Sequence, residues 1–338
     1  MTFNFSDLTP KSAIPPMNCR TFILTFVALC FSVAPLKSFA QKSTSSASTQ
    51  PPSREQILSA RRIVFLGDSI TAGATYVIDF ATVLRSQKLP NGGPEVLSVG
   101  LSSETVSGLS EESHPFPRPC VHERLTRALS ALKADVVFAC YGMNCGVYMP
   151  LDEERFAAFR AGMEKLHNET VASGARIVHI TPPYFDPARK PTQAFYADVL
   201  LKYSEWLVSQ RAQGWEVIDL HSAMREEALK RKALDPKFTF SNDAVHPGAE
   251  GHWLMAQQIL AWLGDSAVAE APTLEALLQK RQFPIAAMKL IEQRVQLTKN
   301  SWVQAIGHNR PGVAKGLPLE EASAKAADLD AQVDALLK

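Results

Sequence analysis

The amino-acid sequence predicts an α/β protein built on a doubly wound, five-stranded parallel sheet. Two patterns lead to this fold class: short runs that are apolar throughout, and segments of helical length and amphipathic pattern that separate them. Strands that are apolar on both faces are typical of parallel sheets covered by helices on both sides. The chain has 338 residues, of which 46% are hydrophobic and 20% charged. It is therefore long enough to bury the core of such a sheet.

The predicted elements alternate along the chain, with no visible internal repeat. The predicted strands are residues 62–66, 95–99, 135–140, 176–180 and 215–220. The predicted helices are residues 76–86, 121–133, 152–172, 192–213 and 249–263. Because a helix stands between successive strands, we expect a flavodoxin-like sandwich of βαβ units.

The N-terminal region is predicted to be a signal peptide followed by a linker. Arg20 precedes an apolar stretch over 22–36, and the small-residue pattern that follows predicts cleavage after Ala40. The stretch is too short for a membrane span, so we expect a secreted or periplasmic protein without a stable membrane anchor. Ser, Thr, Pro and Gln dominate the predicted linker. The predicted organisation is an extension and signal peptide (1–40), a linker (41–55), a main domain (56–265) and a helical C-terminal extension (266–338).

Charge and cysteine content narrow the classes of function. The formal net charge is +1 and no long run of like charges occurs, which argues against nucleic acid as a partner. Cleavage after Ala40 would leave Cys120, Cys140 and Cys145, an odd number with a spacing unlike a zinc site. We expect three part-buried thiols and no metal or organic cofactor.

The stretch "VFLGDSITAG" places Ser69 directly after the first predicted strand. Gly, Asp and Ser are ordinary turn residues, so one interpretation is a simple strand-to-loop turn. The other is a serine nucleophile at the carboxyl end of a strand, where ligands bind in open parallel sheets. The stretch alone leaves both open.

Two later segments also come after predicted strands, the first directly after the third strand and the second after the fifth strand and a short polar helix. "YGMNCG" contains Asn144, which either caps a turn or donates its amide N–H to developing negative charge. "SNDAVHPGAEGH" contains Asp243 and His246, three residues apart and expected on one face of a helical turn, with Pro247 at the first position of the next helix. Asp243 alone could equally be a helix cap. Together with Ser69, however, these residues supply the base and the orienting carboxylate that a serine nucleophile needs.

The ordered set of motifs over residues 61–264 resembles the SGNH/GDSL hydrolases. The resemblance implies Ser69 as nucleophile, with Asp243 and His246 completing a catalytic triad. It also implies an oxyanion hole made by the backbone N–H groups of Ser69 and Ser103 and by the Asn144 amide.

Two positions depart from the family pattern. Ser103 stands where the family usually has glycine, although a backbone donor survives that change, and Gly100 is the candidate glycine for the turn. Cys145 stands where the third motif usually ends in Asp, which is a supporting residue of the family and not a triad member.

The resemblance therefore implies an exported serine ester hydrolase. We expect a small-molecule or polysaccharide ester as substrate, with a short acyl group such as acetyl on a carbohydrate. One alternative is a lipid or thioester hydrolase of the same family. Another is a catalytically silent carbohydrate-binding protein, because fold does not fix function.

The C-terminal residues 266–338 show apolar residues at helical spacing, which predicts helices with one buried stripe. Between two such helices lies the Gly/Pro-rich loop 307–318. One interpretation is a helical hairpin that covers one face of the sandwich, its loop a simple connection. In the other, Arg310 and His308 in the loop, with the nearby Trp302, bind the substrate beyond the ester.

Overall fold

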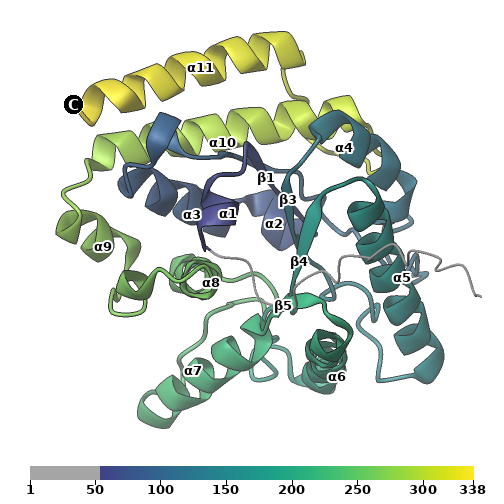
Figure 1. Ribbon diagram of the computed structural model, residues 1–338. Coiled ribbons are helices and arrows are strands. Elements are labelled where there is room, and N and C mark those ends of the chain that lie inside the picture. Colours follow the sequence, from purple (N-terminus) through teal and green to yellow (C-terminus); the bar gives the residue numbers. More distant parts are fainter. Residues whose placement is uncertain (1–53) are drawn as a thin grey trace, which may run out of the picture. The chain divides into compact units, whose positions relative to one another are not determined.

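The computed structural model describes residues 54–338. The predicted signal peptide and nearly all of the predicted linker lie outside the described residues. Within 54–338, five parallel strands form one sheet in the order β2-β1-β3-β4-β5 (Figure 1). The strands are β1 (Arg62–Gly67), β2 (Glu95–Ser98), β3 (Val136–Cys140), β4 (Arg176–Ile180) and β5 (Glu216–Ile218). This order is the flavodoxin-like doubly wound arrangement, and it confirms the predicted fold class.

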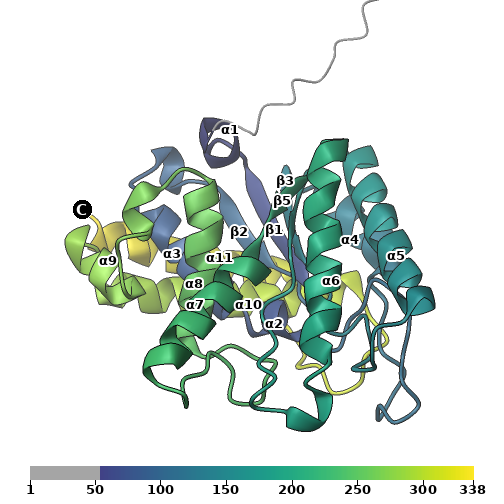
Figure 2. The same ribbon diagram turned by 90° about the horizontal axis from the view of Figure 1, so that it is seen from below.

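Helices cover both faces of the sheet. Helices α3 and α8 lie on one face, and α4, α5 and α6 lie on the other (Figure 2). The α-helices are α1 (Arg54–Leu58), α2 (Ser69–Gly73), α3 (Thr75–Ser86), α4 (Leu125–Leu132), α5 (Glu153–Ala172), α6 (Tyr196–Ser209), α7 (Leu220–Leu234), α8 (Ala249–Trp262), α9 (Leu274–Lys280), α10 (Ile285–Ile306) and α11 (Leu319–Leu336). Within the described part of the chain, no helix has the length and apolar character needed to cross a membrane.

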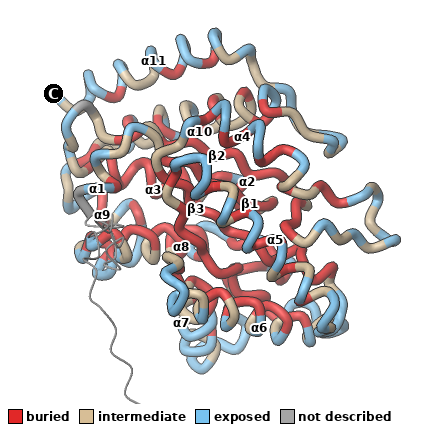
Figure 3. Tube along the Cα trace, turned by 45° about the vertical axis from the view of Figure 1, so that its right-hand side comes forward, coloured by how far each residue is buried: buried red, intermediate tan, exposed pale blue. Residues whose placement is uncertain are grey.

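The core lies between the sheet and its two helical layers. The strands are buried almost throughout, whereas the outer sides of α7 and α11 are exposed (Figure 3). Phe65 of β1 stacks on Phe138 of β3 with ring centroids 5.1 Å apart, and Phe80 of α3 packs edge-on against both rings. Burial on both faces explains why these strands are apolar at every position.

Several predicted elements have different boundaries in the structure, of which two have a clear local cause. The helix predicted over 121–133 begins as a 3₁₀ turn, Val121–Glu123, before α4 starts. The fifth strand, predicted over 215–220, is shorter because Asp219 caps α7. The Asp219 carboxylate accepts a hydrogen bond from the Ser222 N–H at 3.1 Å, so the chain turns into a helix where the strand was expected to continue.

The C-terminal helices α10 and α11 form a hairpin, as expected, but the hairpin does not cover a face of the sandwich. Helix α10 packs along the edge strand β2 and against α3, and α11 packs on the outer side of α10 (Figure 1). An edge strand exposes unpaired backbone groups, and covering it with a helix protects it from pairing with another chain.

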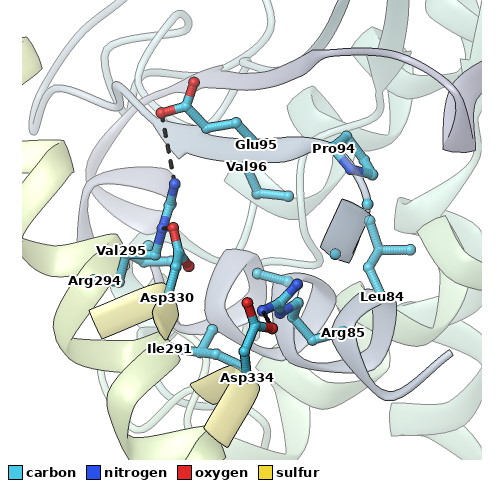
Figure 4. Close-up of a pocket in the computed structure, with 13 residues that line it drawn as sticks. Leu84, Arg85, Pro94, Glu95, Val96, Ile291, Arg294, Val295, Asp330 and Asp334 are labelled. Carbon is cyan, nitrogen blue, oxygen red and sulfur yellow. Dashed lines mark hydrogen bonds and ion pairs between the residues drawn. The ribbon is translucent and has the colours of Figure 1, made fainter. Parts of the chain in front are cut away.

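A pocket of about 180 Å³ lies where this hairpin meets the domain (Figure 4). Arg85 of α3 reaches Asp334 of α11 at 2.5 Å, and Arg294 of α10 reaches Asp330 of α11 at 2.8 Å. Arg294 also lies 3.6 Å from Glu95 of β2. The charged groups that line the pocket are thus paired with each other across the hairpin boundary.

Candidate active site

The first site segment places Ser69 at the start of α2, immediately after β1. The Asp68 carboxylate caps this short helix by accepting a hydrogen bond from the Ile70 N–H at 3.0 Å. Gly67, the last residue of β1, leaves no room for a side chain. A Cβ at this position would lie 2.1 Å from Thr71 Oγ1 and 2.7 Å from the Cys140 carbonyl oxygen, which are both clashes. The "GDS" stretch is therefore a strand-to-helix junction that holds the serine at the carboxyl edge of the sheet.

Ser69, His246 and Asp243 form one hydrogen-bonded chain. Ser69 Oγ lies 2.8 Å from His246 Nε2, and His246 Nδ1 lies 2.7 Å from Asp243 Oδ2. The His246 and Asp243 side chains are about half exposed, at 51% and 56%. A substrate in solution can thus reach them. In this arrangement the imidazole can accept the serine proton while the carboxylate orients the ring.

The segment around Asp243 and His246 differs from the expected helical turn. Asp243 Oδ1 accepts hydrogen bonds from the backbone N–H groups of Val245 and His246, at 2.9 and 2.8 Å. Between them Ala244 has a left-handed backbone with φ of 74°. A tight turn, rather than a helix, therefore brings the two side chains together. Helix α8 begins only at Ala249, so Pro247 precedes the helix instead of occupying its first position.

Two acidic side chains of the site have opposite pKa shifts. Burial alone would raise the pKa of Asp243, but the hydrogen bonds from His246 and from the two backbone N–H groups outweigh it and leave the pKa below its usual range. Burial raises the pKa of Asp68 to about 6, against the opposing effects of the Ile70 N–H and of His246. Asp243 therefore stays ionised near neutral pH, which suits a group that orients an imidazolium ion.

Asn144 follows β3, the neighbour of β1, and lies at the same edge of the sheet as Ser69. It is 4% exposed, and its Nδ2 donates a hydrogen bond to the Glu104 carbonyl oxygen at 3.3 Å. Its Oδ1 accepts hydrogen bonds from Arg118 Nη1 at 3.1 Å and from the Tyr148 hydroxyl at 3.2 Å. One Nδ2–H remains for a ligand.

The loop after β2 carries Ser103 with a left-handed backbone, φ 67°. Glycine adopts this conformation without strain, so the glycine that the resemblance implies at this position would suit the backbone better than serine does. Gly100 serves a different purpose from the expected turn. A Cβ on it would lie 2.4 Å from the Ala72 backbone nitrogen, so Gly100 allows the loop to approach α2.

The three cysteines in the described part of the chain are free. Cys145 is fully buried, and its sulfur accepts a hydrogen bond from the Val106 N–H at 3.4 Å. Its backbone oxygen accepts one from the Ser107 hydroxyl at 3.1 Å. Cys145 thus ties the loop of Asn144 to the loop after β2, so this contact does not require a carboxylate at position 145.

The structure adds supporting residues that sequence patterns did not indicate. Glu104 is fully buried and paired with Arg124, whose Nε lies 2.6 Å from Glu104 Oε1, and the Tyr141 hydroxyl donates to Glu104 Oε2 at 2.7 Å. Lys299 Nζ of α10 donates to the Ala72 carbonyl oxygen at 2.8 Å, near the end of α2. No local motif marks these residues, because their partners are distant in the chain.

Of the three C-terminal candidates, Trp302 is not placed as expected. Its ring centroid lies 5.5 Å from the guanidinium carbon of Arg62, which is the first residue of β1. Ser69 is at the opposite end of this strand, two residues after Gly67. At roughly 3.3 Å per residue, the ends of β1 are about 17 Å apart. Trp302 therefore lies on the side of α10 that faces the strand starts, and its assignment as a substrate residue is corrected.

His308 and Arg310 are closer to the candidate site. His308 lines a cavity of about 390 Å³ together with Leu101 and Glu104, which flank Ser103. The Arg310 guanidinium lies 5.2 Å from the ring centroid of Phe116, two residues before Arg118. The loop 307–318 thus contacts the segment that reaches Asn144.

Residues 54–338 contain no group of three His, Cys, Asp or Glu side chains placed to hold a metal ion.

The chain is similar to one family model and to several solved structures. Residues 65–254 match the GDSL-like Lipase/Acylhydrolase family. The comparison with curated proteins gives no significant match. Among solved structures, BT4096, described as a gut microbial diltiazem-metabolizing enzyme, aligns with a TM-score of 0.51 and 22% identity. The alignment covers 60% of this chain and 47% of BT4096.

Two further solved structures align with lower scores. Axe2 from Geobacillus, described as an acetyl-xylooligosaccharide esterase, has a TM-score of 0.46 and 23% identity over 60% of this chain and 94% of its own. LAE5, from the metagenome of Lake Arreo, has a TM-score of 0.45 and 18% identity, and the alignment covers 60% of this chain and 95% of LAE5.

The fold and the hydrogen-bonded chain from Ser69 to Asp243 define a class of protein, the serine hydrolases that act on ester bonds. Within that class the family is also established, because its model matches more than half of the chain. The chain belongs to the GDSL-like lipase/acylhydrolase family.

Proposed function

We propose that this protein is an exported serine esterase that removes short acyl groups, acetyl in particular, from a carbohydrate. The observation that carries the proposal is the chain Ser69 Oγ to His246 Nε2 to Asp243 Oδ2, at 2.8 and 2.7 Å. A serine hydroxyl is a weak nucleophile until a base removes its proton, and this chain supplies the base and its orienting carboxylate.

The proposed reaction proceeds through an acyl-enzyme. Ser69 Oγ attacks the ester carbonyl carbon while His246 Nε2 accepts the serine proton. The tetrahedral oxyanion accepts hydrogen bonds from Asn144 Nδ2 and the backbone N–H groups of Ser69 and Ser103. When the bond to the alcohol breaks, His246 protonates the leaving oxygen. Water, deprotonated by His246, then attacks the acyl carbon. The bond to Ser69 Oγ breaks, Oγ takes the proton back from His246 Nε2, and the acid is released.

The preference for a short acyl group rests on the surface near the site. In the described residues, the exposed large apolar side chains come from separate segments of the chain, and Met149 and Leu151 are the pair nearest to Asn144 in the sequence. A protein that binds to a lipid surface needs a contiguous patch of exposed apolar side chains. Export rests on the N-terminal sequence, and the mature protein should begin at Gln41 by mass spectrometry.

A substrate panel tests the proposal. Wild type and Ser69→Ala are compared on chromogenic esters of acetate and octanoate, on a thioester, and on acetylated glycans with acetate release as the readout. The proposal predicts that the wild type hydrolyses the acetyl ester and releases acetate from the glycans, and that Ser69→Ala does neither. Equal background in both proteins would favour a silent binding protein, and a preference for octanoate or the thioester would favour the alternative hydrolase.

We also propose that Arg310 contributes to binding of the carbohydrate beyond the ester. Its loop touches Phe116, in the segment that continues to Arg118 and Asn144. Arg310→Ala should leave hydrolysis of a small chromogenic acetate unchanged and reduce turnover of an acetylated polymer. If the variant handles both substrates like the wild type, the loop serves only as a connection.

A further inference from the structure

An ion pair outside the triad holds the amide of Asn144. Arg118 is 9% exposed, and its Nε and Nη2 donate to the two carboxylate oxygens of Glu111 at 2.6 and 2.5 Å. The Arg118 backbone N–H also donates to Ser110 Oγ at 3.0 Å. A two-pronged pairing of this kind fixes the plane of the guanidinium group. The direction of the third nitrogen, Nη1, is thereby defined.

That third nitrogen reaches the Asn144 side chain. Arg118 Nη1 and the Tyr148 hydroxyl both donate to Asn144 Oδ1, at 3.1 and 3.2 Å. An amide oxygen has two lone pairs, so these donors satisfy it fully. Rotation of the amide by 180° would set its NH₂ group against two donors. The contacts therefore keep Nδ2 on the opposite side, where it contacts the Glu104 carbonyl oxygen.

The backbone beside Asn144 supports the same arrangement. Val147 and Tyr148 are consecutive residues with left-handed backbone, φ 48° and 55°. Such conformations are strained in residues other than glycine and persist where the surroundings impose them. Here they place the Tyr148 ring 4.7 Å from Tyr196 in a stack and 5.5 Å from the Arg118 guanidinium carbon.

We propose that Arg118, fixed by Glu111, is a positioning residue for ester hydrolysis. It locks the Asn144 amide so that Nδ2 donates to the oxyanion, and its positive charge polarises that amide. The benefit grows as negative charge develops on the substrate oxygen, so it acts on the transition state more than on substrate binding. The inference rests on the proposed roles of Ser69 and Asn144.

The first measurement is kcat and KM of Arg118→Gln on a short chromogenic ester. Direct loss of an oxyanion donor costs about 10²- to 10³-fold in kcat, so loss of its support should cost less, about 10- to 100-fold. KM should stay within about two-fold, because ground-state binding is little affected. Arg176→Gln is a matched control. Arg176 makes the same paired contacts to Glu216, at 2.6 and 2.5 Å, but at the amino ends of β4 and β5.

A double-mutant cycle separates positioning from general structural support. In an Asn144→Ala background, Arg118→Gln should change kcat by less than about two-fold, because the group that it positions is gone. An equal loss of kcat in both backgrounds would overturn the inference. So would wild-type kcat in Arg118→Gln at an unchanged melting temperature.

Glu111→Gln keeps the test decisive if Arg118→Gln does not fold. This substitution weakens the ion pair that orients Arg118. It should lower kcat by a smaller factor than Arg118→Gln does, and only in a protein that retains Asn144. Labelling of Ser69 by a fluorophosphonate distinguishes the two levels of failure. A wild type that neither hydrolyses esters nor labels would refute the proposed function. A wild type that does both, with kcat unaffected in Arg118 and Glu111 variants, would refute only the positioning role.

Discussion

The carboxyl edge of the sheet and its β2 edge are both held by contacts between residues far apart in the chain, but the contacts differ in kind. At the carboxyl edge, the partly exposed Ser69 and the half-exposed His246 lie 2.8 Å apart, and buried ion-paired residues such as Glu104 and Arg124 support the loops around them. At the β2 edge, arginines of α3 and α10 meet partly exposed carboxylates of α11. Exposed ion pairs contribute little stability.

The difference implies that the two regions can be broken separately. Changes to the exposed His246 and Asp243 at the carboxyl edge should remove activity and leave the fold, because these side chains contribute little to the buried core. Changes at the β2 edge should alter stability and leave activity. Lys299 and Gln296 of α10 connect the two regions, because they donate hydrogen bonds to the Ala72 and Gly73 carbonyl oxygens at the end of α2, at 2.8 and 3.1 Å.

The largest expected effect is that of His246→Ala. Loss of the base should lower kcat on a short ester by about 10⁴- to 10⁶-fold, because the serine is then not activated. The melting temperature should be nearly unchanged, since the imidazole is half exposed. A variant that retains a tenth of wild-type turnover would exclude His246 as the base.

Asn144→Ala should have the next largest effect. Removing one oxyanion donor costs roughly 2.7–4 kcal/mol of transition-state stabilisation, which would be seen in kcat rather than KM. Steady-state kinetics on the same ester measures it. A change confined to KM would instead assign Asn144 to substrate binding.

A stability effect is expected at Asp79 of α3, which lies between the two regions. Burial, followed by the charges of Glu275 and Glu292, raises its pKa to about 7 from 3.8. Because the folded-state pKa is the higher one, the ionised carboxylate destabilises the fold as the pH rises through about 7, and the penalty is absent below about 4. Asp79→Asn should therefore stabilise the protein at pH 8 by roughly 2 kcal/mol. The full pKa shift would correspond to about 4 kcal/mol, which is the upper limit of this gain.

Thermal or urea unfolding at two pH values measures this effect. The gain in unfolding free energy should be present at pH 8 and nearly absent at pH 4. A gain of the same size at both values would mean that packing, and not the charge of Asp79, is responsible.

The smallest effect is expected at Asp334 of α11. Its side chain is 59% exposed, so Asp334→Ala should cost less than about 1 kcal/mol although it removes the contact with Arg85. The neighbouring Val333 is 1% exposed, and Val333→Ala should cost more, about 1–2 kcal/mol. Neither should change kcat. A larger loss for Asp334→Ala than for Val333→Ala would show that the ion pair, and not apolar packing, attaches α11.

The sequence predicted the sheet and the order of site motifs because both depend on local patterns. Uniformly apolar runs indicate buried strands, and Ser69 and Asn144 each follow a strand, so topology gathers them at one edge. His246 lies beyond helix α7, so its motif, and not its position directly after a strand, indicated that it belongs to the site. The turn around Asp243 was mistaken for a helical turn, since spacing of three residues fits both. The roles of Arg118 and Lys299 could not be predicted, because Asn144 is 26 residues from Arg118 and Ala72 is 227 residues from Lys299. Trp302 was misplaced because helical spacing does not tell which side of α10 faces the site.

The most direct test of the central claim is the mass of the intact protein after treatment with a fluorophosphonate, followed by peptide mapping. The proposed triad predicts one adduct per chain, located on Ser69 and absent in Ser69→Ala, with labelling slowed by orders of magnitude in His246→Ala. Labelling at another residue, or equal labelling of wild type and His246→Ala, would contradict the assignment of Ser69 as a nucleophile activated by His246.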